Sequence, residues 1–187
     1  MSSETLFASL SDYVNTNTLP PVENWHPDKQ SCIDIRIDPS GNWIHEGGEI
    51  KRHSMVRVFS SILRKEGSKF YLVTPEVKLE IRVDDVPFLV TNMETSGAGK
   101  NRIVAFVTKA GDYLTLDSNH KLNIEDHGHG VKPYISVRQG MQGLLSRPVY
   151  YQLAEFCSEH GPDAQGKRYL GIWSSGMFFN LSDALGS

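Results

Sequence analysis

The sequence predicts an α+β protein made of two related units, in each of which one helix packs on antiparallel strands. Three observations support this fold class. Apolar and polar residues alternate over several short segments, which is the period of half-buried strands. Two other segments repeat apolar residues at helical spacing. A strand–helix–hairpin pattern also occurs once in each half of the chain, and this indicates a duplicated domain.

Composition and charge describe an ordinary soluble globular protein. The chain has 187 residues, of which 39% are hydrophobic and 22% charged, and its formal net charge is −3. That length suffices for one good core or two smaller ones. The slight negative charge argues against a dedicated nucleic-acid or membrane-surface partner. The first residues lack the pattern of a signal peptide and no apolar run could span a membrane, so we expect a cytoplasmic protein.

Residues 1–24 predict a short N-terminal helix and an extended lead-in. The helix is expected over residues 3–15, where apolar residues fall on one face. Pro20 and Pro21 then prevent any helix from continuing. Trp25 follows, and it either packs as a lid on the edge of a core or stacks on a ligand.

Residues 25–93 form the first expected unit. Ile33, Ile35 and Ile37 alternate with charged residues and predict a strand, which returns through a turn at residues 39–42 into a second strand at residues 43–45. A helix is expected to begin near Ser54 and to end at Gly67. Its apolar face consists of residues at helical spacing, namely Met55, Val58, Phe59, Ile62 and Leu63.

The strongest strand pattern lies in residues 70–88. A turn at residues 74–77, stiffened by Pro75, separates two strands, and Leu79, Ile81 and Val83 alternate with charged residues in the second. We expect these strands to lie beside the first hairpin, with the helix covering one face of the sheet.

Residues 94–101 are small and polar and predict a linker between the units. The fragment from Gly97 to Lys100 is not a phosphate-binding P-loop, because Glu94 stands where the first glycine is needed and Asn101 where a Ser or Thr is needed. The second unit, residues 102–187, is predicted to contain a meander of short strands, a helix starting near Ser146 and a final hairpin.

The internal repeat is clearest just before each predicted helix. The segment Gly48-x-Ile50-x-Arg52 precedes the first helix, and Gly143-x-Leu145-x-Arg147 precedes the second. Each copy therefore places one arginine at a helix start, where the guanidinium and the backbone N–H groups could together bind an anion. The surface between two like domains is also a common place for ligand sites.

Two sets of motifs resemble a bacterial family known as domain of unknown function 1285. The first is Thr74-Pro75-Glu76-x-Lys78 followed by Val86-Pro87-Phe88, and the second is Pro133-Tyr134-x-x-Val137-Arg138. The resemblance implies a domain duplication, a C-terminal half that is pleckstrin-homology-like, and a nucleotide-type ligand bound between the halves in a signalling role. It implies no established activity. Cys32 stands where the family pattern has an acidic residue, so no ligand role is assigned there.

Residue chemistry and the resemblance together give one set of candidate ligand-binding residues. Glu76 and Lys78 are two apart on a strand, so they can face the same ribose and phosphate, although an exposed ion pair would explain them as well. Arginines would bind the anion and aromatic rings would stack on a base. The candidates are Trp43, His45, Arg52, Tyr71, Thr74, Glu76, Lys78, Phe88, Tyr134, Arg138 and Arg147.

No other chemistry is indicated. His127 and His129 beside Asp126 lack the third ligand that a zinc site needs, so neither a metal nor a cofactor is expected. Cys32 and Cys157 are read as inert thiols. No nucleophile has an assignable base, and hence no catalytic residue is expected.

Three functions follow from these observations. The first is a sensor or regulatory protein that binds a small anionic, nucleotide-like ligand where its two units meet, in signal transduction. The second is a protein–protein interaction module, since small β-rich domains present strand edges and grooves to peptides. The third is a hydrolase that uses Glu76 or His45.

Overall fold

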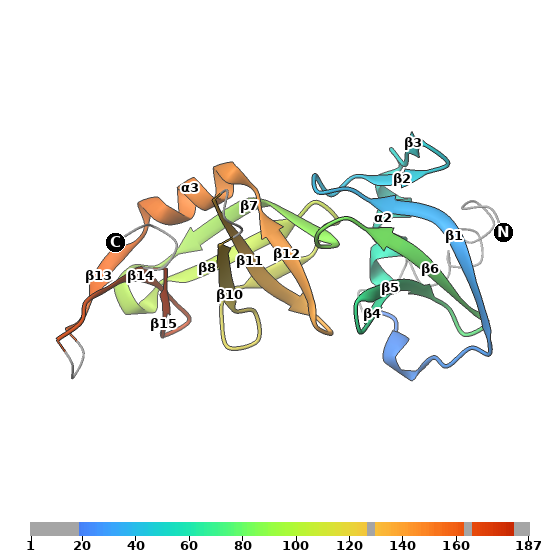
Figure 1. Ribbon diagram of the computed structural model, residues 1–187. Helices are drawn as coiled ribbons and strands as arrows, with labels where there is room; N and C mark the ends of the chain where they lie inside the picture. The colour runs from blue at the N-terminus through green and yellow to red at the C-terminus, as the bar shows by residue number, and fades with distance from the viewer. Residues whose placement is uncertain (1–18, 127–129, 163–165, 182–187) are drawn as a thin grey trace. The chain divides into compact units, whose positions relative to one another are not determined.

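The computed structural model describes residues 19–126, 130–162 and 166–181 (Figure 1). The chain forms two compact units, Met1–Pro87 and Phe88–Ser187. The helix expected over residues 3–15 lies outside the described residues. Within them, no helix is long and apolar enough to cross a membrane.

In the residues that the structure describes, the first unit is one mixed sheet with one α-helix, α2. Its sheet has the strand order β3-β2-β1-β6-β5-β4, in which β1 and β6 pair in parallel and the other neighbours are antiparallel. The elements are η1 (Val22–Asn24), β1 (Lys29–Ile37), β2 (Trp43–His45), β3 (Gly48–Glu49), α2 (His53–Ser61), β4 (Leu63–Glu66), β5 (Lys69–Val73) and β6 (Val77–Val83).

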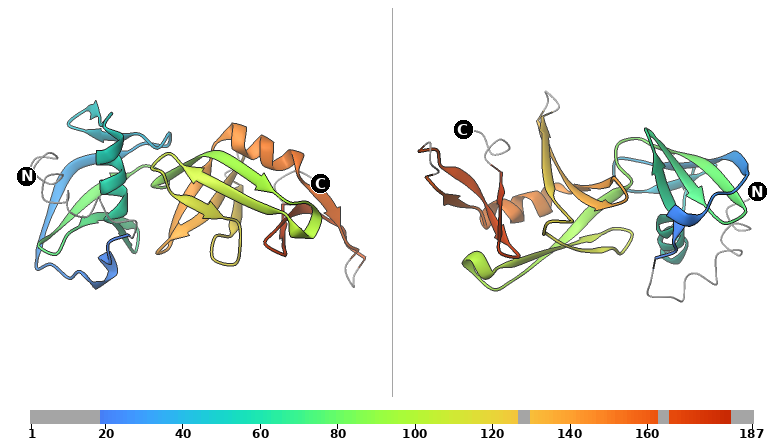
Figure 2. Two further views of the ribbon diagram at one scale, coloured as in Figure 1. Left: turned by 180° about the vertical axis from the view of Figure 1, so that it is seen from behind. Right: turned by 90° about the horizontal axis from the view of Figure 1, so that it is seen from below.

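The two faces of this sheet differ as the alternation in the sequence predicts. Helix α2 lies across one face, where Ile35 and Ile37 of β1 and Ile81 of β6 are buried (Figures 1 and 2). Trp43 on β2 meets Phe59 on α2 with ring centroids 6.0 Å apart. The charged residues of β1 and β6 project from the other face, because neighbours along a strand point to opposite sides.

Helix α2 is shorter than the sequence predicts. It ends at Ser61 rather than Gly67, its N-cap residue is Arg52 rather than Ser54, and residues 63–66 form β4. Leu63 is buried as the first residue of β4, and it would also face the core at the end of a longer helix. Helical spacing of the apolar residues therefore could not exclude a strand here. Pairing with β5 decides the outcome, and Gly67, with a φ of +59°, supplies the tight turn between β4 and β5.

Over its described ranges, the second unit contains two sheets and one α-helix, α3. Its six-stranded sheet has the order β10-β11-β12-β7-β8-β9, and a three-stranded sheet has the order β13-β14-β15. The elements are β7 (Phe88–Ser96), η2 (Gly99–Asn101), β8 (Ile103–Thr108), β9 (Tyr113–Thr115), β10 (Leu122–Asp126), β11 (Val131–Arg138), β12 (Met141–Leu145), α3 (Arg147–Glu155), β13 (Ser158–His160), β14 (Tyr169–Ser174) and β15 (Met177–Asn180).

One boundary of this unit differs from the prediction. The units divide after Pro87, whereas residues 94–96 of the expected linker end strand β7 and pair with β8 through Ser96 and Ile103. Small polar residues suit a hairpin connection as well as a linker, so composition alone could not separate the two. Helix α3 starts as expected and ends at Glu155, because the residues that follow it, 158–160, pair with β14.

The duplication is present in the order of the elements. In the first unit β2 and β3 are followed by α2 and the meander β4–β5–β6, and in the second β11 and β12 are followed by α3 and the meander β13–β14–β15. Both strand pairs turn through two consecutive residues of positive φ, Glu46-Gly47 and Gln139-Gly140. The copies differ in pairing, since only the first meander joins the main sheet of its unit.

Candidate functional site

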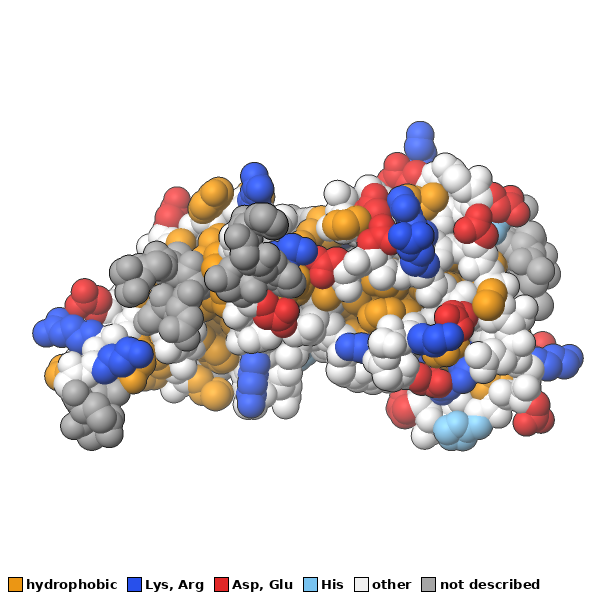
Figure 3. Space-filling view, viewed as in Figure 1, with side chains coloured by type: hydrophobic (Ala, Val, Ile, Leu, Met, Phe, Trp, Pro, Cys, Tyr) orange, Lys and Arg blue, Asp and Glu red, His pale blue; other side chains and the backbone are white. Residues whose placement is uncertain are grey.

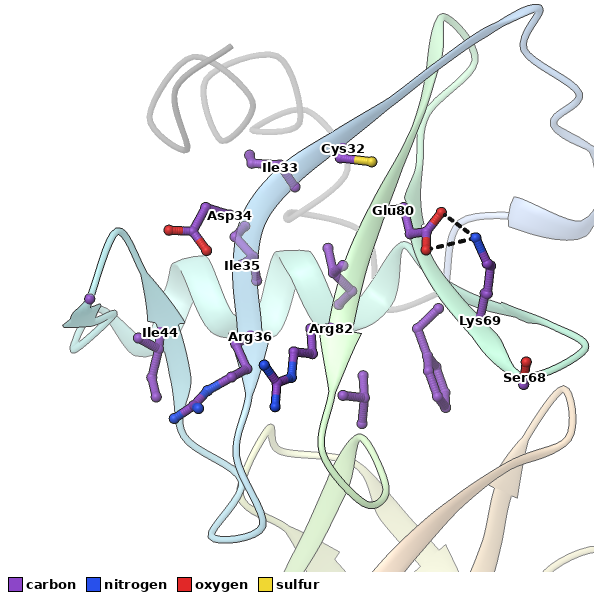
Figure 4. A pocket seen from close by; sticks show the side chains of 14 residues that line it. Cys32, Ile33, Asp34, Ile35, Arg36, Ile44, Ser68, Lys69, Glu80 and Arg82 are labelled. Atoms are coloured by element: carbon purple, nitrogen blue, oxygen red, sulfur yellow. Dashed lines mark hydrogen bonds and ion pairs between the residues drawn. The ribbon is translucent and has the colours of Figure 1, made fainter.

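A groove of about 820 Å³ is lined by β1, β2, β6 and the start of β5 in the first unit (Figure 4). Its charged side chains include Arg36 from β1, Glu80 and Arg82 from β6, and Lys69 from β5. In the space-filling view, basic and acidic side chains lie next to one another over the strands of this unit (Figure 3). We call this feature the β1–β6 groove.

Two arginines lie side by side in the groove. Arg36 and Arg82 are register partners on the parallel strands β1 and β6, so both side chains project from the same face of the sheet (Figure 4). The Nε of Arg36 is 3.7 Å from Oδ2 of Asp84, and the Nε of Arg82 is 3.0 Å from Oδ1. One carboxylate therefore holds both guanidinium groups. Asp84 is itself fixed at the end of β6, where its backbone N–H donates to the carbonyl of Ile37 at 3.0 Å.

The charges of this cluster do not cancel. Two guanidinium groups face the one carboxylate of Asp84, which leaves one excess positive charge within this cluster. Asp34 on β1 also lines the groove, so its carboxylate balances that charge over the groove as a whole. The side chains of Arg36 and Arg82 are 42% and 74% exposed, whereas that of Asp84 is 18% exposed. Within the described part of the chain, Asp84 is the ion-pair partner of both arginines. Each guanidinium carries five N–H donors, so most of its donors remain available to an anion.

The β5 side of the groove is electrically balanced. Lys69 forms an ion pair with Glu80 at 2.9 Å, and this hydrogen bond, with the charge of Glu80, raises the pKa of the lysine. Cys32 is the register partner of Glu80 on β1, and its thiol is exposed in the groove. The local excess of positive charge thus lies at the arginine pair, and Asp34 is the remaining carboxylate that lines the groove.

Comparison with family models decides the identity of the chain. Residues 20–86 match the N-terminal domain of DUF1285, a domain of unknown function, and residues 87–181 match the C-terminal domain of the same family. The chain belongs to the DUF1285 family. The boundary between the two family domains lies within one residue of the boundary between the compact units.

Solved structures agree with this assignment. A crystal structure of a DUF1285 family protein from Silicibacter pomeroyi is 36% identical, has a TM-score of 0.78, and aligns over 94% of this chain and 93% of that one. A second crystal structure, of a DUF1285 family protein from Shewanella baltica, is 22% identical and has a TM-score of 0.53. The alignment covers 65% of this chain and 90% of that one, and this similarity supports the fold alone. A search of curated proteins finds no match.

Lys78, a predicted site residue of this DUF1285 chain, lies in a cluster of charges beside β4. Its Nζ donates to Glu66 at 2.8 Å and lies 4.6 Å from the centre of the Tyr71 ring. Arg64 contacts the other oxygen of the same carboxylate. The hydrogen bond from Lys78, followed by the contact from Arg64, lowers the pKa of Glu66. Lys78 therefore joins β4 to β6, while its presumed partner Glu76 is exposed in the turn.

Thr74 organises that turn. Its hydroxyl oxygen accepts hydrogen bonds from the backbone N–H groups of Glu76 at 3.2 Å and Val77 at 3.0 Å, and its own N–H donates to the carbonyl of Val77 at 2.9 Å. The residue is 6% exposed. These contacts give Thr74 a structural role that explains its place in the motif.

The predicted aromatic residues lie in the cores of the two units. Trp43, Tyr71, Phe88 and Tyr134 are all 5% exposed or less. A ring enclosed in this way stabilises its unit by packing, and its contact with a ligand stays a prediction. His45 is only partly buried, with its Nδ1 4.0 Å from the carboxylate of Glu46.

The three predicted arginines lie in two kinds of environment. Arg52 is exposed at the N-cap of α2, and Arg147 is exposed as the first residue of α3, so the repeat places them at nearly equivalent positions. Arg138 instead forms an ion pair with Asp112 and lies 4.7 Å from the centre of the Phe88 ring, with its side chain 14% exposed. Arg138 therefore has a structural role in the second unit.

The sequence analysis missed Arg36, Arg82 and Asp84. Both strands showed alternating charges, and this placed each arginine on a polar face. The missing information was that β1 and β6 are neighbours in parallel register. Within the described ranges, no group of three or more His, Cys, Asp or Glu residues is placed to hold a metal ion. His127 and His129 lie outside those ranges.

Proposed function

We propose that this DUF1285 protein is a regulatory protein that binds a small anionic, nucleotide-like ligand, with the anion held by Arg36 and Arg82 in the β1–β6 groove. One observation carries the proposal. Two arginines occupy paired positions on adjacent strands, both are held by the single carboxylate of Asp84, and both are open to solvent.

The chemistry of the arginine pair favours phosphate or carboxylate. Guanidinium groups match the geometry of both anions and bind them through parallel hydrogen bonds. Because Asp84 contacts both Nε atoms, the pair is already positioned before an anion arrives, and this reduces the entropy lost on binding. A volume of about 820 Å³ also falls within the range of small-molecule sites.

This proposal moves the site from the place that the sequence analysis favoured. The sequence analysis predicted a ligand at the surface between the units. All residues that line the β1–β6 groove instead belong to the first unit. The proposal also includes a role in signal transduction, a cytoplasmic location and a pleckstrin-homology-like second unit. These three parts rest on the sequence and on family resemblance. No contact observed favours a hydrolase based on Glu76 or His45, so hydrolysis is not proposed.

Calorimetric titration of the full chain with pyrophosphate and with AMP tests the anion site. Replacing Arg82 by Gln removes one charged set of donors and should weaken binding by about ten-fold. Arg36→Gln should have a similar effect. Arg57→Gln is the matched control, because Arg57 is exposed on α2 and its loss changes the net charge equally. Equal affinity in all three variants would contradict the proposal.

The thiol of Cys32 provides a second readout of the same site. A ligand in the groove should slow the alkylation of Cys32, since this thiol is exposed in the groove four residues before Arg36 on β1. The half-buried Cys157 in the second unit serves as the internal control. Tight binding that leaves the alkylation rate of Cys32 unchanged would place the anion elsewhere.

A further inference from the structure

The three-stranded sheet of the second unit carries aromatic rings on its solvent face. His160 pairs with Tyr169, and Trp173 pairs with Phe178, so the four side chains project from one side of the sheet. The alternating residues of the other face, among them Ile172 and Phe179, are buried. We call these four residues the aromatic face. His160 is exposed, and Tyr169, Trp173 and Phe178 are each half-buried. The solvent side of an antiparallel sheet is normally polar, and partly exposed aromatic rings on that side are a feature of binding sites.

Three rings of the aromatic face, those of His160, Trp173 and Phe178, contact one another. His160 stands edge-on to Trp173, with centroids 5.1 Å apart and an interplanar angle of 86°. Phe178 lies 4.6 Å from His160 and 5.5 Å from Trp173. Each ring therefore restrains its neighbours, and a ligand would find them already positioned.

Gly171 makes this arrangement possible. A Cβ atom at Gly171 would lie 2.7 Å from Cζ of Phe178, so the Phe178 ring rests against the bare backbone of β14. No other residue would let an aromatic ring approach the strand so closely. The tip of the Phe178 ring therefore lies over Gly171.

A pocket and two lysines complete the feature. The pocket has a volume of about 390 Å³ and is lined by His160, Pro162, Tyr169, Phe178 and their neighbours. The Nζ of Lys100 lies 5.1 Å from the centre of the Trp173 ring, and that of Lys167 lies 5.2 Å from the centre of the Tyr169 ring. Both lysines bring positive charge to the rings.

We infer that the aromatic face is a second binding site, which takes a small planar aromatic ring bearing an acidic group. The rings supply stacking surface and the lysines complement the negative charge. A polynucleotide would need a basic track along its backbone, whereas this chain has a net charge of −3. A small molecule therefore fits better. The site shares no residue with the β1–β6 groove, because all of its residues belong to the second unit.

NMR titration of the full chain tests this inference with three related probes. AMP has both ring and anion, adenosine has the ring alone, and ribose 5-phosphate has the anion alone. AMP should shift the Gly171 amide and the Trp173 indole signals, adenosine should shift them more weakly, and ribose 5-phosphate should leave them unchanged. Equal effects of AMP and ribose 5-phosphate on these signals would overturn the inference.

Amino-acid substitutions separate the stacking of the ligand ring on Phe178 from the attraction of its acidic group to Lys100. Phe178→Leu should weaken AMP binding at this face at least about five-fold, since stacking on one ring contributes that much. Tyr151→Leu is the control, because Tyr151 is an exposed aromatic on α3. Lys100→Gln should weaken AMP but not adenosine, with the exposed Lys121→Gln as its control.

The outcome also separates the two sites. If AMP perturbs only residues of the β1–β6 groove, and Arg82→Gln abolishes that response, the inference about the aromatic face is overturned and the proposed function stands. If the response of the aromatic face persists in Arg82→Gln and is lost in Phe178→Leu, the inference is supported whatever the groove binds.

Discussion

Gly171→Ala is predicted to destabilise the second unit more than any other glycine-to-alanine change considered below. The new Cβ would lie 2.2 Å from the carbonyl oxygen of Phe179, and real Cβ atoms essentially never approach such atoms within 3.0 Å. The gap of about 0.8 Å must open between two hydrogen-bonded strands, β14 and β15, because the obstacle is backbone. Overpacking of this kind costs about 2–3 kcal/mol.

Two other glycines give an internal scale for this change. A Cβ at Gly143 would meet the Phe88 and Val137 side chains at 3.2 and 3.3 Å, so a small adjustment suffices and about 1 kcal/mol is expected. A Cβ at Gly48 would have its nearest contact at 3.6 Å, and Gly48→Ala should change stability by less than about 0.5 kcal/mol.

Urea denaturation followed by far-UV circular dichroism measures the series. The free energy of unfolding should fall in the order Gly48→Ala, Gly143→Ala, Gly171→Ala. Thermal melting should show the same order, with a decrease of roughly 10 °C for Gly171→Ala if the second unit unfolds by itself. A Gly171→Ala protein as stable as Gly143→Ala would refute the argument that β15 blocks the position.

Three further predictions concern single side chains. The hydrogen bond from Lys78 lowers the pKa of Glu66 from its ordinary value of 4.5, so the stability that ionised Glu66 contributes is present above that pH and is lost as the pH falls. Glu66→Gln should therefore lower the free energy of unfolding by less than about 1 kcal/mol at pH 7. Thermal melts of the two proteins at pH 3 should show no difference. Ellman's reagent should react at least about ten-fold faster with Cys32 than with Cys157, because burial raises the pKa of the Cys157 thiol. Comparable reaction rates in the two single Cys→Ser variants would argue against a difference in thiol burial. Thr74→Ala should cost about 1 kcal/mol because two backbone N–H groups lose their acceptor, whereas Thr74→Ser keeps the hydroxyl and should unfold at nearly the wild-type urea concentration.

Local patterns in the sequence were sufficient for much of the fold. The alternation of Ile33, Ile35 and Ile37 predicted β1, and the pattern of residues 70–88 predicted β5 and β6 with their turn. The repeated step before Arg52 and Arg147 predicted the duplication. Each of these signals lies within a few residues along the chain, and such local periodicity fixes which face of an element is buried.

Local patterns failed where two structures fit the same residues. Leu63 could end a helix or begin a strand, and residues 94–96 could form a linker or end β7. In both cases pairing with a distant strand decided the outcome, namely β5 for residues 63–66 and β8 for residues 94–96. The sequence does not encode such pairing within a short window.

The candidate site depends almost entirely on tertiary structure. The sequence by itself determined that Arg36 and Arg82 lie on the polar faces of their strands, and that the chain carries the motifs of the DUF1285 family. Only the folded chain places β1 beside β6 in parallel register, and this brings two arginines more than forty positions apart to one carboxylate. The same packing buries Trp43, Tyr71, Phe88 and Tyr134, because a ring's exposure is set by the elements that cover it and not by its own neighbours in sequence.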